Sequence, residues 1–371
     1  MKKINGLDTL RAFAVFFVIV EHFGVWFDDT SVSGKLVRYV IIPDGGFGVD
    51  LFFVLSGFLI TSILFNAKRN GGNTSPFHIV RNFFVRRALR IFPIYYLLLF
   101  LLFFFHYPDI KDHMGYYLTY TANILCFRTN TWNNFSHTWT LDVEEQFYLL
   151  WPWLVIFIKD RNFMYVAFVS ILLGIASTYV VLTVQNHIAP FLVFNCMDSF
   201  AMGGLYAWAR LQAKTEKNFE RTLNLTVVAA LAVYFYWKLV PFIANGAALP
   251  CFFLTKTVNS IISLWLIMLV VNNKSKWIGK YILGNKILNF IGKISYGLYL
   301  YHYIYIAGYC AQVNSFLYHL TPYHVFNETI HDHHFDYWIQ VSIMVAIAVL
   351  SYLLIEKPLL KLKTRFNYND K

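Results

Sequence analysis

Apolar stretches about as long as a lipid bilayer is thick recur along the whole chain. A membrane-spanning helix needs about 20 consecutive, mostly apolar residues. Stretches near that length occur at about 7–27, 45–66, 91–106, 143–158, 163–184, 190–209, 224–244, 250–272, 288–310 and 337–356. The 371 residues are 58% hydrophobic and 14% charged, with a mean hydropathy of +0.50, which excludes a soluble enzyme. We predict an all-α, polytopic membrane helical bundle of about ten transmembrane helices, the least certain being 143–158, which opens with Glu144 and Glu145.

The Lys and Arg residues gather in alternate segments between these stretches. Short cytoplasmic loops accumulate basic residues. The segment at about 67–90 is rich in them, whereas 311–336 has none. We therefore predict a multi-pass protein of the inner or plasma membrane with both termini in the cytoplasm. The net charge of +11 follows from this topology, so we expect membrane lipids and no nucleic acid as partners. Residues 1–371 are expected to form one membrane domain with no appended soluble domain and no cleavable signal peptide.

Two ionisable residues in the first apolar stretch form an R-x10-H pattern. An ionisable side chain near the centre of a membrane helix costs about 2.5 to 3.5 kcal/mol, so its presence needs a reason. At 100° per residue, eleven steps place Arg11 and His22 on one helix face, about 16 Å apart along the axis. His22 is therefore either a functional residue or a packing histidine that hydrogen-bonds across the bundle.

Several motifs, in order, resemble the acyltransferase-3 family of integral membrane acyltransferases. The resemblance covers essentially the whole chain, with small departures such as Thr9 and Ala12, where the family often has Gly. The motifs are Leu7-Asp8-Thr9-Leu10-Arg11 with His22, Phe52-Phe53-Val54-Leu55-Ser56-Gly57-Phe58-Leu59-Ile60-Thr61, Arg87-Ala88-Leu89-Arg90-Ile91-Phe92-Pro93-Ile94-Tyr95, Trp139-Thr140-Leu141-Asp142-Val143-Glu144-Glu145-Gln146-Phe147-Tyr148, Ile294-Ser295-Tyr296-Gly297-Leu298-Tyr299-Leu300-Tyr301-His302 and Glu356-Lys357-Pro358-Leu359.

The resemblance implies transfer of an acyl group, usually acetyl, from cytoplasmic acyl-CoA (acetyl-CoA) to a hydroxyl group. We predict an O-acetyltransferase that acts on a cell-envelope polysaccharide, a lipopolysaccharide or a lipid-linked glycan, with acyl-CoA as donor substrate and no metal. Two alternatives stay open. One is an acyltransferase with a small-molecule acceptor. The other is a transmembrane carrier of a glycan precursor or acyl metabolite, in which Arg11 and His22 bind or relay substrate.

The catalytic residues predicted on this basis are His22, Arg11, Glu144 and Asp50. A hydroxyl is a poor nucleophile until a base removes its proton, and imidazole is the commonest such base near neutral pH. Whether His22 acts as a base in direct transfer or is itself acylated stays open. Arg11 either holds the donor or orients a carboxylate, or it only sets topology. Glu144 and Asp50 are predicted as partners of the acceptor or of the imidazole, with a helix-terminal role as the alternative for each.

The donor is predicted to bind at a cluster of arginines before Pro93. Arg87 and Arg90 are spaced i,i+3 on one helical face within the R-x-x-R-I-x-P-x-Y motif that ends at Tyr95, and Arg86 directly before the motif completes the cluster. Guanidinium groups bind phosphate through paired hydrogen bonds, and coenzyme A carries several phosphates. Anchoring to anionic lipid is the alternative function of this cluster.

For several other residues, a structural role is expected or stays open. Ser56 and Gly57 are expected to allow close helix packing. His302 is equally consistent with a functional and a packing role. The histidines at 331, 333 and 334 are expected in a solvated loop, since no complete zinc ligand set is evident. The four cysteines, Cys126, Cys196, Cys251 and Cys310, are too scattered for a zinc site and are expected to be mainly unpaired.

Overall fold

The structure is a computed structural model, and every secondary-structure element in its described part is helical. The described residues are 6–23, 34, 36–70, 74–107, 109–133, 135–243, 251–273, 275, 277–304 and 333–368. The longer helices are α1 (Leu7–Phe23), α3 (Gly45–Asn70), α4 (Pro76–Phe104), α7 (Trp139–Phe157), α8 (Phe163–Tyr179), α9 (Met197–Ala209), α10 (Ala213–Ile243), α11 (Thr255–Val271), α12 (Lys286–Ile304) and α15 (His333–Ser351). The shorter helices are η1 (Val37–Ile41), α5 (Ile110–Leu118), α6 (Ala122–Thr129), η2 (Ser136–Thr138), η3 (Asp160–Asn162), η4 (Val180–Val184), η5 (Val193–Cys196), η6 (Phe252–Leu254), η7 (Ile278–Leu283), η9 (Tyr352–Glu356), α16 (Lys357–Lys361) and η10 (Leu362–Arg365).

Each predicted apolar stretch overlaps one of the longer helices. Within the described residues, six helical segments are long and apolar enough to cross a membrane: Gly45–Asn70, Pro76–Phe104, Asp160–Val184, Ala213–Val240, Phe252–Val271 and Val341–Arg365. Helix α9 has only 13 residues. At 1.5 Å per residue it is about 20 Å long, shorter than the bilayer core of about 30 Å. The predicted count of about ten spans therefore stays a prediction.

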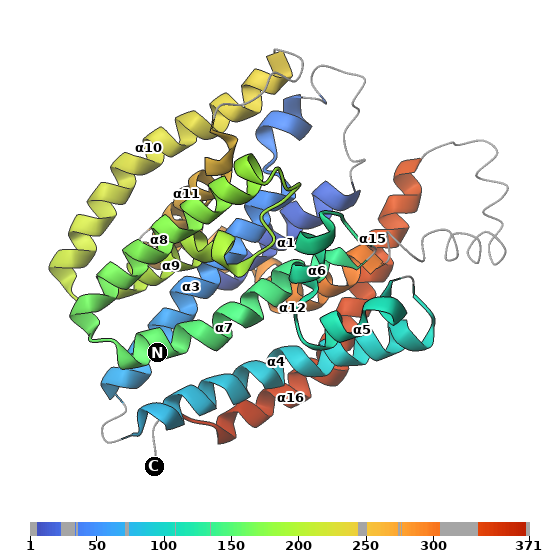
Figure 1. The fold of residues 1–371 in the computed structure, drawn as a ribbon, viewed down its shortest axis with the longest axis horizontal. Coiled ribbons are helices and arrows are strands. Elements are labelled where there is room, and N and C mark those ends of the chain that lie inside the picture. The colour runs from blue at the N-terminus through green and yellow to red at the C-terminus, as the bar shows by residue number, and fades with distance from the viewer. Residues whose placement is uncertain are drawn as a thin grey trace.

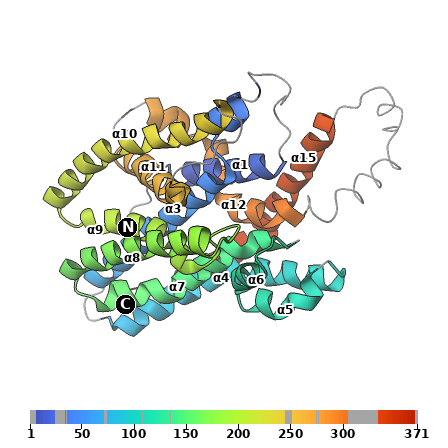
Figure 2. The same ribbon diagram turned by 45° about the horizontal axis from the view of Figure 1, so that its top comes forward.

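Helix α3 is the centre of the bundle. It packs against α1, α7, α9 and α11, and α1 in turn packs against α12. Figures 1 and 2 show α10 along one edge of the molecule and α4 along the opposite edge, with α3 between them. The buried side chains between these helices are mostly large, such as Phe53, Phe58, Phe147 and Trp151. Most residues of α3 are therefore buried against other helices.

Glycines let α3 and α9 approach at backbone distance. A Cβ atom added to Gly57 of α3 would lie 2.0 Å from the carbonyl oxygen of Phe200, and one added to Gly203 of α9 would lie 2.1 Å from that of Val54. Neither backbone oxygen can move away without moving its helix. The close helix approach predicted at Gly57 is therefore confirmed.

We expect Gly57→Ala to destabilise the folded protein by about 3 kcal/mol, because overpacking forces backbone shifts. The measurement is the midpoint of thermal unfolding in detergent. Gly115→Ala is the matched control, since an added Cβ there meets no atom within 4 Å. Equal midpoints for the two variants would contradict the proposed tight contact between α3 and α9.

The structure corrects the predicted basic loop at 67–90. Helix α3 continues to Asn70 and α4 begins at Pro76, so most of that segment is helical. Charged side chains of this segment form ion pairs and hydrogen bonds with neighbouring helices. Lys68 and Arg69 bind Asp160 at 3.0 and 3.2 Å, and Lys68 also donates to the carbonyl oxygens of Val155 and Ile158 near the end of α7. The polar residues thus interrupt the apolar pattern but not the helix. The segment between α4 and α7 is also largely helical, since it contains α5 and α6.

The described cysteines have free thiols. Cys126 and Cys196 are buried and Cys251 is exposed, which confirms the expectation for these three. Cys310 and His331 lie outside the described residues, as do the side chains of His333 and His334.

Candidate active site

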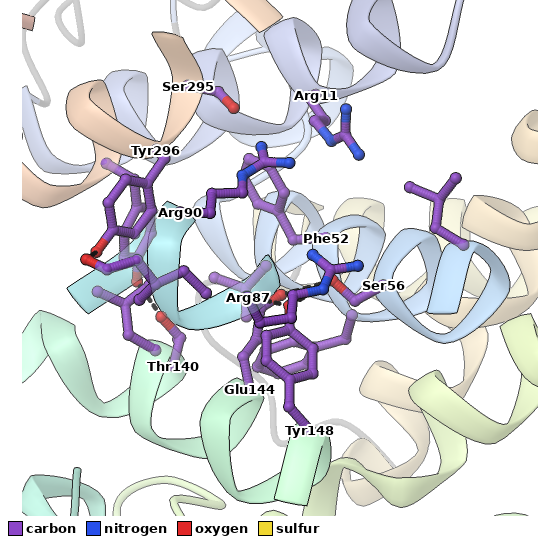
Figure 3. Close-up of a pocket in the computed structure, with 16 residues that line it drawn as sticks. Arg11, Phe52, Ser56, Arg87, Arg90, Thr140, Glu144, Tyr148, Ser295 and Tyr296 are labelled. Carbon is purple, nitrogen blue, oxygen red and sulfur yellow. Dashed lines mark hydrogen bonds between the residues drawn. The ribbon is translucent and has the colours of Figure 1, made fainter. Parts of the chain in front are cut away.

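Three arginines from two helices line one cavity. Arg11 comes from α1, and Arg87 and Arg90 come from successive turns of α4. The other walls come from α3, α7 and α12, including Ser56, Glu144, Tyr148, Ser295, Tyr296 and Tyr299. Figure 3 shows the guanidinium groups of Arg87 and Arg90 projecting into the space between these helices, with Arg11 beside them. The i,i+3 spacing of Arg87 and Arg90 thus places both side chains in the same cavity.

The positive charge of this cavity is only partly compensated. Arg11 donates to Asp8 Oδ1 at 2.6 Å. Within the described part of the chain, neither Arg87 nor Arg90 forms a salt bridge, and the guanidinium of Arg87 lies 5.1 Å from the centre of the Tyr148 ring. Both arginines are half-buried, and the Glu144 carboxylate lines the same cavity and offsets part of their charge without a direct salt bridge. An anionic group bound in the cavity would pair directly with these guanidinium groups.

Glu144 faces the same cavity and has fixed partners. Ser56 Oγ donates to Glu144 Oε1 at 2.8 Å, and Tyr148 Oη donates to Oε2 at 2.9 Å (Figure 3). Both carboxylate oxygens are therefore engaged within the cavity, and the predicted contact of Glu144 with His22 is not formed. Ser56, which was expected only to pack, is the hydrogen-bond donor that orients this carboxylate.

Asp50 was predicted to pair with an imidazole, but its partners among the described residues are different ones. Its Oδ1 accepts from Lys256 at 2.7 Å and its Oδ2 accepts from Asn259 at 3.1 Å, and both residues lie on α11. The ammonium group of Lys256 also lies 4.8 Å from the centre of the Phe53 ring. Asp50 is therefore a buried ion-pair partner between α3 and α11, because a lysine and an amide each donate to one of its two oxygens.

We expect Lys256→Met to destabilise the protein by about 3 to 5 kcal/mol, because it leaves the Asp50 carboxylate buried without its cation. The double variant with Asp50→Asn is expected to recover most of that loss. Thermal unfolding in detergent measures both effects, and turnover per folded molecule is expected to be unchanged in the double variant. A double variant that is stable but inactive would return Asp50 to the catalytic machinery.

Arg86 and Tyr95 are not among the residues that line the cavity, and their contact with the donor stays a prediction. Arg86 Nη1 donates to the carbonyl oxygens of Lys363 and Phe366 at 3.0 and 2.9 Å. Tyr95 is buried, and its hydroxyl donates to the carbonyl oxygen of Tyr117 at 2.9 Å. Arg86 is one residue, or about 100°, away from Arg87 around α4, so it holds the C-terminal segment instead.

His22 lies in a second group of side chains, which we call the histidine cluster: His22, His137 and His302. The ring centroids of His22 and His302 are 4.9 Å apart, and those of His137 and His302 are 5.3 Å apart. His22 is in the last turn of α1 and is exposed, whereas His137 and His302 are buried. His22 is not among the residues that line the arginine cavity. Arg11 and His22 therefore share a helix, but they belong to two adjoining sites.

Tyr299 forms a shared wall between the two sites. It lines the arginine cavity, and its ring centroid is 5.3 Å from that of His302. Its hydroxyl donates to the carbonyl oxygen of His137 at 2.9 Å and is also hydrogen-bonded to Thr140 Oγ1. Tyr299 therefore contacts both the arginine cavity and the histidine cluster.

Comparison with known protein families identifies the family to which the chain belongs. A family model described as an acyltransferase domain matches residues 4–356. The chain belongs to the acyltransferase-3 family. In this acyltransferase the matched region contains both the arginine cavity and the histidine cluster.

Three relatives in the family illustrate its range. A provisionally named peptidoglycan O-acetyltransferase, YrhL of Bacillus subtilis (strain 168), is 28% identical over 96% of this chain and 55% of its own length. A provisionally named O-acetyltransferase, SACOL0978 of Staphylococcus aureus (strain COL), is 29% identical over 97% and 58%. The peptidoglycan O-acetyltransferase OatA of Listeria monocytogenes serovar 1/2a (strain ATCC BAA-679 / EGD-e) is 26% identical over 81% and 49%. The chain thus spans about half the length of these relatives. No solved structure matches it.

Sequence reasoning did not find the residues that join the two sites. His137 lies two residues before the Trp139 motif, and Tyr299 lies within the motif that ends at His302. Position within the family motifs was the available signal, but it does not reveal which side chains meet. Among the described residues, no group of three His, Cys, Asp or Glu side chains has the arrangement of a metal site.

Proposed function

We propose that this chain is a membrane O-acetyltransferase that moves an acetyl group from cytoplasmic acetyl-CoA to a hydroxyl group of a cell-wall glycan. The observation that carries the proposal is the cavity lined by Arg87 and Arg90, which form no salt bridge with any residue that the structure describes. Coenzyme A supplies phosphates, and guanidinium groups bind phosphate strongly. The relatives named as peptidoglycan O-acetyltransferases support the acceptor class.

The proposed topology brings donor and acceptor from opposite sides. With about ten spans and cytoplasmic termini, the start of α1 faces the cytoplasm and its last turn lies toward the outer face. Arg11 is in the second turn of α1 and His22 is in the last turn. The donor phosphates would then enter from the inside, while the glycan hydroxyl reaches His22 from the outside.

In the proposed reaction, His22 is the general base. Its Nδ1 lies 2.9 Å from the carbonyl oxygen of Val18, which can only accept a hydrogen bond, so Nδ1 carries the proton and Nε2 is the basic nitrogen. Nε2 removes the hydroxyl proton, the hydroxyl oxygen bonds to the acyl carbon, and the carbon–sulfur bond breaks with its electron pair on sulfur. The proton then passes to the thiolate. A scheme through an acylated His22 uses the same residue.

The test is ester formation in a bacterial host whose wall glycan lacks O-acetyl groups. Cells that express the chain are expected to yield base-labile acetate and acetylated glycan fragments in mass spectrometry, and cells with His22→Ala are expected to yield neither. Ester formation that does not depend on the chain would overturn the proposal. Transport of a labelled glycan precursor without any ester would instead support a carrier.

A further inference from the structure

Each ring of the histidine cluster is held by one nitrogen on a backbone carbonyl oxygen. His22 Nδ1 lies 2.9 Å from Val18 O, and His137 Nε2 lies 3.2 Å from Leu300 O. His302 Nδ1 is bonded to Tyr299 O. A carbonyl oxygen cannot donate, so each of these ring nitrogens carries a hydrogen. In the neutral rings, the other nitrogen must therefore be a lone-pair acceptor, which is Nε2 in His22, Nδ1 in His137 and Nε2 in His302.

Two of these acceptor nitrogens are buried without a partner. His137 Nδ1 and His302 Nε2 have no hydrogen-bond donor in the described part of the chain. Buried polar atoms are normally hydrogen-bonded, and an exception calls for an explanation. An additional proton on a neighbouring ring would supply the missing donor. His22 is the exposed member of the cluster, so it is the ring that can exchange that proton with substrate.

The surroundings favour one shared proton rather than several. The groups that face these rings are the three imidazoles, from α1, η2 and α12, and the phenols of Tyr299 and Tyr303. Among the described residues, no carboxylate contributes to the charge environment of His137 or His302. Burial lowers the pKa of His137 to about 3, so that ring stays neutral near neutral pH. A second proton would add a buried like charge, which repels the first.

We propose that His302 is a positioning residue for His22, and that its Nε2 accepts a hydrogen bond from the proton that His22 removes from the acceptor hydroxyl. This inference rests on the proposed function. The hydroxyl O–H bond breaks and an N–H bond forms on His22. That proton is then shared with Nε2 of His302 while the oxygen–acyl bond forms and the carbon–sulfur bond breaks. His22 finally returns the proton to the sulfur of coenzyme A, so atoms and charge balance.

Two substitutions at residue 302 separate this role from a packing role. His302→Asn keeps a donor near Tyr299 O but removes the acceptor that faces His22, whereas His302→Gln places an amide oxygen near the position of Nε2. With acetyl-CoA and purified wall glycan strands, we expect kcat of His302→Asn to fall by about 10- to 100-fold. Its KM for acetyl-CoA is expected to stay within about twofold, because the donor cavity is untouched. His302→Gln is expected to recover part of kcat.

The pH dependence gives the decisive measurement. A hydrogen bond to the charged imidazole stabilises protonated His22, so its loss is expected to move the acid limb of the kcat profile about one to two pH units lower in His302→Asn. If His302 only packs, kcat is expected to fall equally in the Asn and Gln variants, and the acid limb of the kcat profile is expected to stay at its wild-type pH. This result would overturn the inference.

A second measurement does not require turnover. Nitrogen-15 NMR of histidine-labelled full-length protein in nanodiscs follows the titration of His22, whose signal is identified by its loss in His22→Gln. His302→Asn is expected to lower the His22 midpoint. The control, Tyr303→Phe, keeps the ring whose centroid lies 5.3 Å from His22 and is expected to leave the midpoint unchanged. A shifted midpoint without any ester in wild-type protein would refute the proposed function alone, whereas ester formation with an unshifted midpoint would refute this inference alone.

Discussion

His22→Ala is expected to abolish ester formation while leaving donor binding intact. A positioned general base contributes about 10²- to 10⁴-fold to a rate, and the loss is complete if His22 also carries the acyl group. The arginine cavity is expected to remain formed, because His22 does not line it. The measurement is labelled acetate transferred to wall glycan, with acetyl-CoA binding followed in parallel by isothermal titration.

His113→Ala is the control for this substitution, since His113 lies on α5, away from both sites. It is expected to retain wild-type activity. Loss of acetyl-CoA binding in His22→Ala would show that the substitution disturbs the fold or the cavity. Wild-type turnover in His22→Ala would remove the central residue of the proposed reaction.

Neutralising Arg87 and Arg90 is expected to weaken the binding of the donor rather than the chemical step. A hydrogen bond to a charged group contributes about 1.5 to 3 kcal/mol, so Arg90→Gln is expected to raise KM for acetyl-CoA by roughly 10- to 100-fold. The double variant with Arg87→Gln is expected to raise it further. Steady-state kinetics over a range of acetyl-CoA concentrations measures both, with kcat changing much less than KM.

Arg81→Gln provides the matched control. Arg81 is on the same helix and carries the same charge, but it is exposed and does not line the cavity. If its KM rose as much as that of Arg90→Gln, general attraction of an anionic donor to a basic surface would explain the effect. Such a result would exclude a specific phosphate site.

The helices were predictable because apolar runs of the required length leave few other structures in a bilayer. The prediction was less accurate where charged residues interrupt such a run. Lys68 and Arg69 stay helical because Asp160, which is distant in sequence, pairs with both. A hydropathy pattern does not contain such long-range pairs, so the sequence predicted a loop where α3 and α4 continue.

In the candidate site, too, arrangements set by spacing within one helix were predictable, whereas contacts between helices were not. Arg87 and Arg90 reach one cavity because their spacing on a single helix decides which way they face. The partners of Asp50 and Glu144 depend instead on which helices pack together. Lys256 lies on α11 and Ser56 on α3, and both contacts form only in the folded bundle. Motif position alone therefore suggested imidazole partners that the structure does not contain.

The position of Tyr299 at both sites affects how the thioester of a bound acetyl-CoA survives while no acceptor is present. Under the proposed reaction, a donor bound in the arginine cavity would lie against the Tyr299 ring, and the histidine cluster, whose His302 ring centroid is 5.3 Å from that of Tyr299, lies beside the same ring. Water that reaches His22 from outside would then be kept from the acyl carbon until that ring shifts. We expect wasteful hydrolysis of acetyl-CoA to be slow for this reason, and to quicken when Tyr299 is replaced by a smaller side chain.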